Sequence, residues 1–211
     1  MIKKEQIVAR KPATDTEETR RQILEASFHL FGLKGYDGVS VQDIAKATNL
    51  SKGALYWHFH NKEELYYECL KDFRHMLRRY IFRQLELVDS PEQRVELFFE
   101  GIKNLLQDQE IVDCAAGFFI GMGRTDQEKI SYFRERTYAE SENFLTETLE
   151  TGRSQGVFTF DVEAAGLARA MWTLMEGCIL QLRRQPLEQT SETVEALRSV
   201  FCAGIRMNPS S

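Results

Sequence analysis

Apolar residues recur every three or four positions along most of the chain, which is the spacing of one face of an α-helix. Caps, glycines and prolines divide this pattern into separate segments. The strand alternative, Val157 to Phe160, is four residues long and too short to build a sheet. The pattern therefore predicts an all-α protein of about nine helices. The predicted helices are 16–34, 41–48, 52–58, 62–87, one opened by Ser90 and Pro91, a segment of at most two turns over 114–122, one from Asp126 to a stop at 152–156, 162–184 capped by Asp161, and 191–206.

Three helix starts lie within the twenty-six residues from Ser40 to Leu65. Ser40, Ser51 and Asn61 each carry a side-chain oxygen that can accept a hydrogen bond from a backbone N–H of the following turn. Asn49 lies between the first two helices and tolerates the left-handed conformation that a sharp turn needs. The spacing predicts two short helices joined by a tight turn, with a long helix directly after them.

The middle helix of this stretch, residues 52–58, is only two turns long, so Leu55 and Phe59 must pack it against its neighbours. Its first turn carries small residues and Lys52, a cation that opposes the helix dipole unless an anion lies there. Hydroxyl, imidazole and ammonium groups follow, where they can reach phosphate oxygens. This arrangement is typical of the recognition helix of a DNA-reading helix-turn-helix, whose first turn meets base edges.

The stretch from Gly35 to Leu65 resembles the N-terminal domain of the tetracycline-repressor (TetR) family of bacterial regulators, and the similarity extends over residues 17–67. Asn49 stands where the family often has glycine, and asparagine can adopt the same backbone conformation. The matching elements are Ile23 to Phe31 before a Gly-x-x-Gly turn, Ser-Val at the second helix start, Leu55-Tyr56-x-x-Phe59, and Lys62-Glu63-Glu64-Leu65. The resemblance implies that Gln42, Lys52, Gly53 and Ala54 lie near bases and that Tyr56, His58 and Lys62 lie on phosphates; Ser51 and Trp57 complete the predicted DNA-binding set.

Charge is divided unevenly along the chain. The net charge of −5 looks wrong for a DNA-binding protein, but residues 1–62 hold 10 Lys and Arg against 7 Asp and Glu, whereas residues 63–211 hold 17 against 25. The positive potential is therefore confined to one end, as a nucleic-acid face on an acidic body requires. The chain has no run of eighteen apolar residues and no apolar stretch after its first lysines, so we expect a cytoplasmic protein without a membrane partner.

Three regions follow from these patterns: a flexible basic arm over residues 1–15, a helix-turn-helix domain over 16–61, and a larger α-helical ligand-binding and dimerisation domain over 62–211. The helix predicted over 62–87 joins the two domains without a flexible linker. The helix 162–184 is apolar on most sides, and it and the helix 191–206 carry small residues that permit close approach. We expect these two helices to build a homodimer, as the resemblance also implies; an intramolecular core is the alternative.

The second half also carries an aromatic and methionine-rich set that can line a cavity for a small apolar or aromatic effector. Plain core packing explains any single member better, so the cavity depends on the set as a whole. Glu176 is the most informative member, because a carboxylate between apolar neighbours is costly to bury without a partner, which could be a ligand or Arg169. The predicted ligand-binding residues are Phe99, Phe118, Phe119, Met122, Tyr138, Trp172, Met175 and Glu176.

No catalytic or metal-binding motif is present in the sequence, so we expect neither an enzyme nor a cofactor. The four cysteines are far apart, which favours buried free thiols over a redox pair. The sequence therefore predicts a ligand-responsive, dimeric transcriptional regulator, a repressor that binds a palindromic operator in double-stranded DNA and is released by an effector. Two alternatives stay open: a small all-α metabolite-binding protein or enzyme, and a thiol-based redox sensor acting through Cys114 or Cys178.

Overall fold

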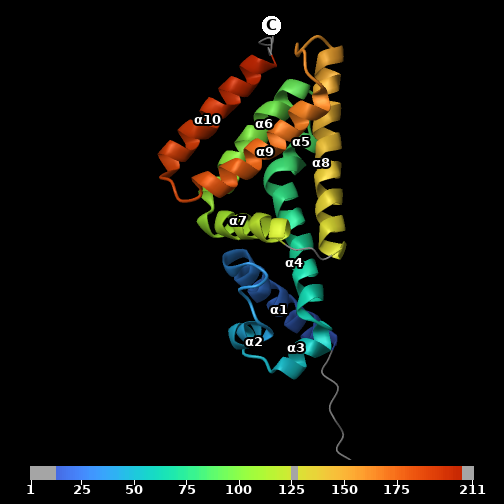
Figure 1. Ribbon diagram of the computed structural model, residues 1–211, viewed down its shortest axis with the longest axis vertical. Coiled ribbons are helices and arrows are strands. Elements are labelled where there is room, and N and C mark those ends of the chain that lie inside the picture. The colour runs from blue at the N-terminus through green and yellow to red at the C-terminus, as the bar shows by residue number, and fades with distance from the viewer. Residues whose placement is uncertain (1–12, 125–127, 206–211) are drawn as a thin grey trace, which may run out of the picture.

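The structure, a computed structural model, describes residues 13–124 and 128–205, and this part of the chain is helical with no strand (Figure 1). Three segments, α4, η1 and α5, follow one another without a break, so the described residues form nine helical rods and the predicted all-α class is confirmed. The helices are α1 Ala13–Lys34, α2 Val41–Thr48, α3 Lys52–His58, α4 Lys62–Leu77, η1 Arg78–Phe82, α5 Arg83–Glu86, α6 Pro91–Gln107, α7 Gln109–Arg124, α8 Glu128–Ser154, α9 Ala164–Leu182 and α10 Leu187–Gly204.

The helices are arranged as a small head and a larger body (Figure 1). Helices α1 to α3 form the head at one end, and α4 runs from the head into the body. In the body, α8 packs along α9, and α6 packs against both η1 and α10. Helix α7 lies across the junction, where it contacts α1 of the head. The rod from α4 to α5 and the α1–α7 contact are therefore two physical links between head and body.

The α1–α7 contact is a backbone-to-backbone crossing. A Cβ added at Gly117 of α7 would lie 1.5 Å from the carbonyl oxygen of Gly32 in α1, and a Cβ added at Gly32 would lie 2.7 Å from Cα of Cys114. Neither position has room for a side chain, so glycine is required at both. Beside the crossing, the ring of Phe118 packs between Phe28 at 4.9 Å and Phe73 at 5.2 Å, which makes the core continuous between head and body.

Helix boundaries differ from the predictions at two places in the body. The segment predicted as two turns over 114–122 is the sixteen-residue helix α7, because the carboxylate of Asp108 accepts from the N–H of Ile111 and starts the helix five residues earlier. Helix α10 begins at Leu187 instead of residue 191, because Pro186 stands at its N-cap and its carbonyl accepts from Thr190 N–H at 3.0 Å.

Smaller differences concern helix starts. The predicted cap Asp161 is wrong, because α9 begins at Ala164 after Glu163, and no side chain caps it. Residues 13–15 belong to α1 and not to the predicted arm, while the rest of that arm and the helix start predicted at Asp126 lie outside the described residues. No described helix is long and apolar enough to span a bilayer.

Candidate functional site

Helix α2 is fixed at its first residue by a reciprocal cap. The hydroxyl of Ser40 accepts from Asp43 N–H at 3.2 Å, and the Asp43 carboxylate accepts from Ser40 N–H at 2.8 Å and from its hydroxyl at 2.6 Å. These hydrogen bonds from Ser40 lower the pKa of the Asp43 carboxyl. The cap satisfies N–H groups that a helix leaves without partners, so the start of α2 is tightly defined.

The turn between α2 and α3 depends on Asn49. Its φ is 53° and its ψ is 35°, the left-handed conformation predicted from the sequence. Asn49 is the one non-glycine residue with positive φ in the described part of the chain. The next amide, of Leu50, donates to the carbonyl of Ala45 at 3.0 Å and closes the end of α2. The turn directs α3 away from α2 within two residues.

Helix α3 is held from one side and exposed on the other. Ser51 caps it by accepting from Ala54 N–H at 3.1 Å. Leu55 and Phe59 are each 3% exposed, so they pack the helix against its neighbours as predicted. On the outer side, Tyr56 is 50% exposed and Trp57 is 70% exposed. Gln42, Ser51, Lys52 and Gly53 are exposed as well, while Ala54 and His58 are partly buried. The structure thus leaves most of the predicted DNA-binding residues of α2 and α3 accessible on the surface of the head.

Gly53 is not required by the fold. A Cβ added there would meet only the Ser51 hydroxyl at 3.8 Å, an ordinary contact. Glycine inside a helix costs roughly 0.5–1 kcal/mol relative to alanine. The head therefore carries a small destabilising residue on the exposed first turn of α3 for no packing reason.

Lys62 differs from the other members of the predicted set. Its ammonium group donates to the carbonyl oxygens of Tyr36 at 2.9 Å and Val39 at 3.0 Å, and lies 3.9 Å from the centre of the Tyr36 ring. These contacts tie the start of α4 to the loop before α2. The structure therefore gives Lys62 an intramolecular role that the sequence did not reveal, and its predicted contact with phosphate stays a prediction.

The geometry defines a class: a capped helix-turn-helix head, joined by a continuous helical rod to an all-α body. A family model described as bacterial regulatory proteins, tetR family, matches residues 23–69, which run from α1 into α4. Residues 23–69 therefore match the N-terminal domain of this family, as the sequence resemblance indicated.

Similar proteins extend the comparison over the whole chain. The transcriptional regulator AcrR of Shigella flexneri is 41% identical over 61 residues, 29% of this chain and 28% of that protein. TtgR of Pseudomonas putida is 26% identical over 181 residues, 82% of this chain and 83% of that protein. A TetR regulator from Chloroflexus aurantiacus superposes with a TM-score of 0.77 at 23% identity over 92% of this chain and 96% of its own, which shows the fold. For several relatives the chain spans less than two thirds of their length.

The predicted ligand-binding residues fall into two groups. Phe118, Phe119, Met122 and Met175 are at most 4% exposed and belong to the core, as does Phe99, which also lines a small surface pocket with Arg198. Tyr138, Trp172 and Glu176 form the second group, at the contact of α8 with α9. The rings of Tyr138 and Trp172 are 4.9 Å apart and edge-to-face.

This second group contains polar atoms in an apolar place. The indole Nε1 of Trp172 is buried and makes no hydrogen bond of good geometry with the described residues. Burial raises the pKa of the Glu176 carboxyl, and burial together with the charge of Glu176 raises the pKa of the Tyr138 hydroxyl. The neighbouring Trp172 side chain lowers both pKa values in part, so it offsets some of the cost of burial. Arg169, the alternative partner for Glu176, instead donates to Glu142 at 2.6 Å.

Trp172 also lines a pocket of about 270 Å³ between the α4–η1–α5 rod and α8. Sequence reasoning missed the other side chains of this pocket. They combine apolar surface with charges at its mouth: Arg74, His75, Leu77, Arg78, Phe82, Glu86, Thr137, Glu140, Ser141 and Phe144. The signal that could have found them is the pair Arg74 and Arg78, four residues apart on the helix predicted to join the two domains. None of the other predicted ligand residues lines this pocket.

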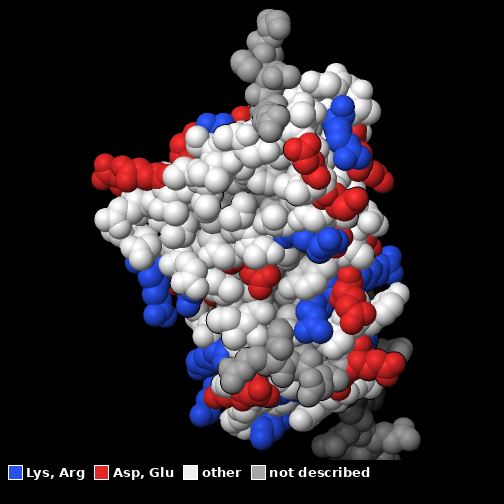
Figure 2. Space-filling model, turned by 45° about the horizontal axis from the view of Figure 1, so that its top comes forward, with Lys and Arg blue, Asp and Glu red and all other residues white. Residues whose placement is uncertain are grey.

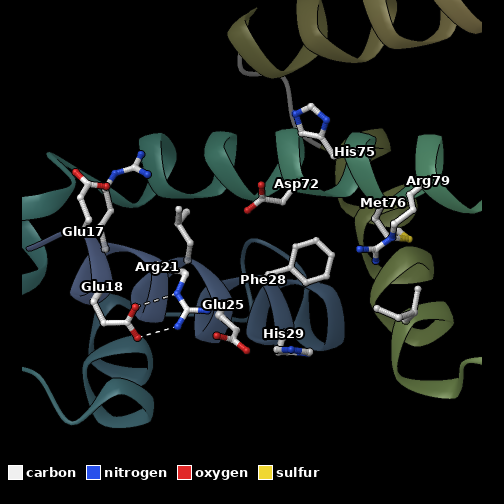
Figure 3. Close-up of a pocket in the computed structure, with 13 residues that line it drawn as sticks. Glu17, Glu18, Arg21, Glu25, Phe28, His29, Asp72, His75, Met76 and Arg79 are labelled. Atoms are coloured by element: carbon white, nitrogen blue, oxygen red, sulfur yellow. Dashed lines mark hydrogen bonds and ion pairs between the residues drawn. The ribbon is translucent and has the colours of Figure 1, made fainter. Parts of the chain in front are cut away.

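A wider groove of about 1240 Å³ lies between α1 and α4 (Figure 3). Phe28 and Met76 contribute apolar surface, and Asp72 and Arg79 from the rod face Glu25 from α1 across the groove. None of the predicted ligand residues lines it. Its rim carries both signs of charge and it opens broadly to solvent, so its chemistry selects no ligand class.

Proposed function

We propose that the protein is a ligand-responsive transcriptional regulator, a repressor that binds a palindromic operator as a homodimer. The observation that carries the proposal is helix α3: capped by Ser51, packed through Leu55 and Phe59, and exposed along Lys52, Gly53 and the residues beyond. A short helix held this firmly, with a bare glycine on its outer turn, suits entry into the major groove. The relatives AcrR and TtgR are transcriptional regulators by name, which supports the same reading for this chain.

We expect the two predicted domains to have different functions. Residues 16–61 would read double-stranded DNA, and residues 62–211 would take the effector and form the dimer. Within the head, we expect Tyr56 and His58 to supply phosphate contacts and Lys52 to lie near bases. Lys62 has two of its three ammonium donors engaged by carbonyl oxygens, so at most one donor is left for a phosphate.

The dimer would form through the outer faces of α9 and α10, the two helices predicted for this role. Small residues line the outer face of α9, where Gly166, Ala170 and Gly177 leave room for close approach. On α10, Val200 is 73% exposed. The space-filling view, in which polar and apolar uncharged residues are both white, shows an area with few charged side chains on the upper part of the visible face (Figure 2). An exposed apolar and small-residue surface of this kind supports a protein interface.

The effector would bind in the pocket beside the rod, with its polar end toward Trp172. Phe82, Phe144 and Trp172 offer aromatic surface, which suits the small apolar or aromatic molecule expected from the sequence. Binding there would contact both the rod that carries the head and the helices that carry the dimer face. A coupling of roughly 1–3 kcal/mol between effector and operator would give a useful switch.

Selection of bound sequences from a random pool of duplex DNA tests the proposal. We expect an inverted repeat whose half-sites lie about 34–36 Å apart, one turn of the duplex. A shared half-site without its inverted copy would contradict the dimeric arrangement. Failure to enrich any sequence at low salt would contradict the DNA-binding function and favour a metabolite-binding protein.

The thiol-sensor alternative loses support from the structure. Cys69, Cys114 and Cys178 are buried and free, and burial raises the pKa of both Cys114 and Cys178 to about 11. A reactive thiol needs a lowered pKa and access to solvent. We therefore expect operator affinity to be insensitive to mild oxidants.

A further inference from the structure

The mouth of the pocket beside the rod holds more cations than carboxylates. Arg74 and Arg78 line it from the rod and lie one turn apart, since the amide of Arg78 donates to the carbonyl of Arg74. The carboxylates that line it are Glu86 and Glu140. Arg136 of α8 adds a third guanidinium through its own ion pair with Glu140. Among the described residues, three guanidinium groups therefore share two carboxylates at this mouth.

Arg78 has a carboxylate of its own. Its guanidinium donates to Glu86 twice, from Nε at 3.1 Å and from Nη2 at 2.8 Å. A bidentate pair of this kind matches the two groups in geometry as well as in charge. Both residues belong to the continuous rod, so the pair does not depend on the position of α8. We therefore expect Arg78 to stay with Glu86 when the pocket is occupied.

Arg74 shares its carboxylate with another arginine. Glu140 accepts from Arg74 Nη1 at 3.1 Å, across from the rod to α8, and from Arg136 Nε at 2.8 Å, one turn earlier on α8. If Arg74 turns to another anion, Glu140 keeps Arg136 and is not left without a cation. The Arg74 side chain is 36% exposed, so the pair that it leaves is a weak one. Arg74 is thus the guanidinium of the three that can change partner most easily.

The other polar groups of the pocket favour a ligand that accepts hydrogen bonds. The hydroxyl of Thr137 donates to the carbonyl of Phe133 at 2.8 Å, and the hydroxyl of Ser141 donates to the carbonyl of Thr137 at 3.0 Å. Both hydroxyl protons are therefore engaged within α8. Both carboxylates at the mouth already have guanidinium partners, which disfavours a cationic ligand. The donors that remain are those of a guanidinium, which binds a carboxylate best.

Apolar side chains form the rest of the pocket. Leu77 and Phe82 from the rod and Trp172 from α9 are largely buried, and Phe144 adds a ring from α8. The rings of Phe82 and Trp172 are stacked with 6.2 Å between centroids. The volume of about 270 Å³ is at the lower end of the range for ligand sites. The pocket therefore suits a small molecule with one aromatic or apolar body.

We propose that the effector is a small aromatic or apolar monocarboxylate, and that Arg74 binds its carboxylate in exchange for Glu140. A single negative charge matches the single cation in excess at the mouth. The uncharged polar end of the molecule then faces Trp172, and the carboxylate lies at the mouth. The role of this anion as effector rests on the proposed function, whereas its binding depends on the pocket alone.

Probes that share one body and differ in charge test the ligand class. Phenylacetate, cinnamate and para-methoxycinnamate are each compared with the primary amide and the primary amine of the same body, by calorimetric titration of the full chain without DNA. We expect the carboxylates to bind at least about tenfold tighter than their amides, because the hydrogen bond to the guanidinium becomes charge-assisted. The amines should bind more weakly than both. Amides or amines that bind as tightly as the carboxylates would overturn the proposal, as would no binding of any probe at millimolar concentration.

Glu140→Gln separates an exchange of partners from a purely structural ion pair. Because Glu140 competes with the ligand for Arg74, its loss should raise the affinity for the carboxylates by at least about threefold and leave that for the amides unchanged. If Arg74 only tied the rod to α8, the variant would weaken carboxylates and amides alike. Glu135→Gln removes an exposed charge from the same helix outside the pocket, so it is the matched control. Carboxylate binding no tighter in Glu140→Gln than in Glu135→Gln would overturn the exchange.

Arg74→Gln removes the proposed partner itself. The affinity for the carboxylates should fall to within about threefold of that for the amides, while the amides bind as they do to the wild-type protein. Arg83→Gln is the control for the lost charge, because Arg83 is an exposed cation of the rod outside the pocket. It should keep the preference for carboxylates. A preference that survives in Arg74→Gln would place the anion on another residue and overturn the assignment.

The titrations and the DNA selection can fail independently. If selection enriches no sequence while carboxylates are preferred, the anion site stands and the regulatory function fails. If selection yields an inverted repeat while amides or amines bind best, the regulatory function stands and the anion site fails. Where both succeed, the best carboxylate should release the wild-type protein from the selected operator, and Arg74→Gln should need at least about tenfold more of it.

Discussion

Replacing Gly53 should change stability and DNA binding in opposite directions. Its added Cβ would meet no obstacle, so Gly53→Ala should raise the free energy of unfolding by roughly 0.5–1 kcal/mol. The same methyl group would stand between the helix backbone and the DNA, so operator affinity should fall. Urea unfolding and fluorescence anisotropy measure the two effects.

Gly204→Ala, at another open helical glycine far from the head, is the control for this substitution and should leave operator affinity unchanged. Full operator affinity in Gly53→Ala would remove this glycine from the interface.

Lys62 and Lys52 should respond differently to the same substitution. Lys62→Ala leaves the carbonyls of Tyr36 and Val39 without their donor, so the free energy of unfolding should fall by about 1–3 kcal/mol. Lys52 is exposed, so Lys52→Ala should leave stability unchanged and make the salt dependence of DNA binding shallower. If Lys62→Ala instead flattens the salt dependence without loss of stability, the phosphate contact predicted from the sequence is its main role.

Glu176 should carry a pH signature. Burial raises its pKa, so the folded state binds the proton more tightly than the unfolded state, and the associated stability is present at low pH and lost as pH rises through the folded value. Glu176→Gln should therefore be more stable than wild type at neutral pH, with the difference vanishing below the ordinary glutamate pKa. Thermal unfolding across pH measures this, with exposed Glu147→Gln as control. A variant less stable at neutral pH would reveal an unseen cationic partner.

Among the elements, those fixed by local chemistry were predictable from the sequence. Helices α2 and α3 have the predicted bounds because Ser40, Asn49 and Ser51 act through hydrogen bonds and backbone angles within a few residues. The π-helical segment η1 was not predicted, because the room for its backbone comes from Gly101 on another helix, α6. Lys62 was misjudged for the same reason: its carbonyl partners lie 23 and 26 residues away in sequence. The ligand pocket likewise combines side chains from three helices, and only Trp172 of the predicted set lines it.

At the α1–α7 crossing, a glycine-to-alanine substitution should lower the free energy of unfolding, whereas Gly53→Ala should raise it. Gly117→Ala would place a Cβ 1.5 Å from the Gly32 carbonyl oxygen, so the helices must separate, at a cost of about 3 kcal/mol or more. Urea unfolding measures the loss, and limited proteolysis of α1 shows whether the head loosens from the body. Unchanged stability together with an intact proteolytic pattern would mean that the crossing is looser than the structure has it.

At the scale of the whole molecule, the arrangement depends on two copies of the chain. The proposed interface is an outer face of α9 and α10 with small residues and an exposed Val200. Ala170→Glu or Val200→Glu would put a carboxylate opposite its own copy across a two-fold axis, where it is desolvated and repelled. We expect the dimer dissociation constant to rise at least about a hundredfold. Sedimentation velocity over a range of concentrations measures it.

Leu87→Glu is the matched control, because Leu87 is 78% exposed at the far end of the rod, outside α9 and α10. It should leave the dimer intact. The interface variants should also bind an isolated half-site as wild type does but lose the preference for the inverted repeat, since α9 and α10 lie in the body and the substitutions leave the head unchanged. An interface variant that stays dimeric and keeps that preference would move the two-fold axis to another face, and the separation of the recognition helices would then be set by different elements.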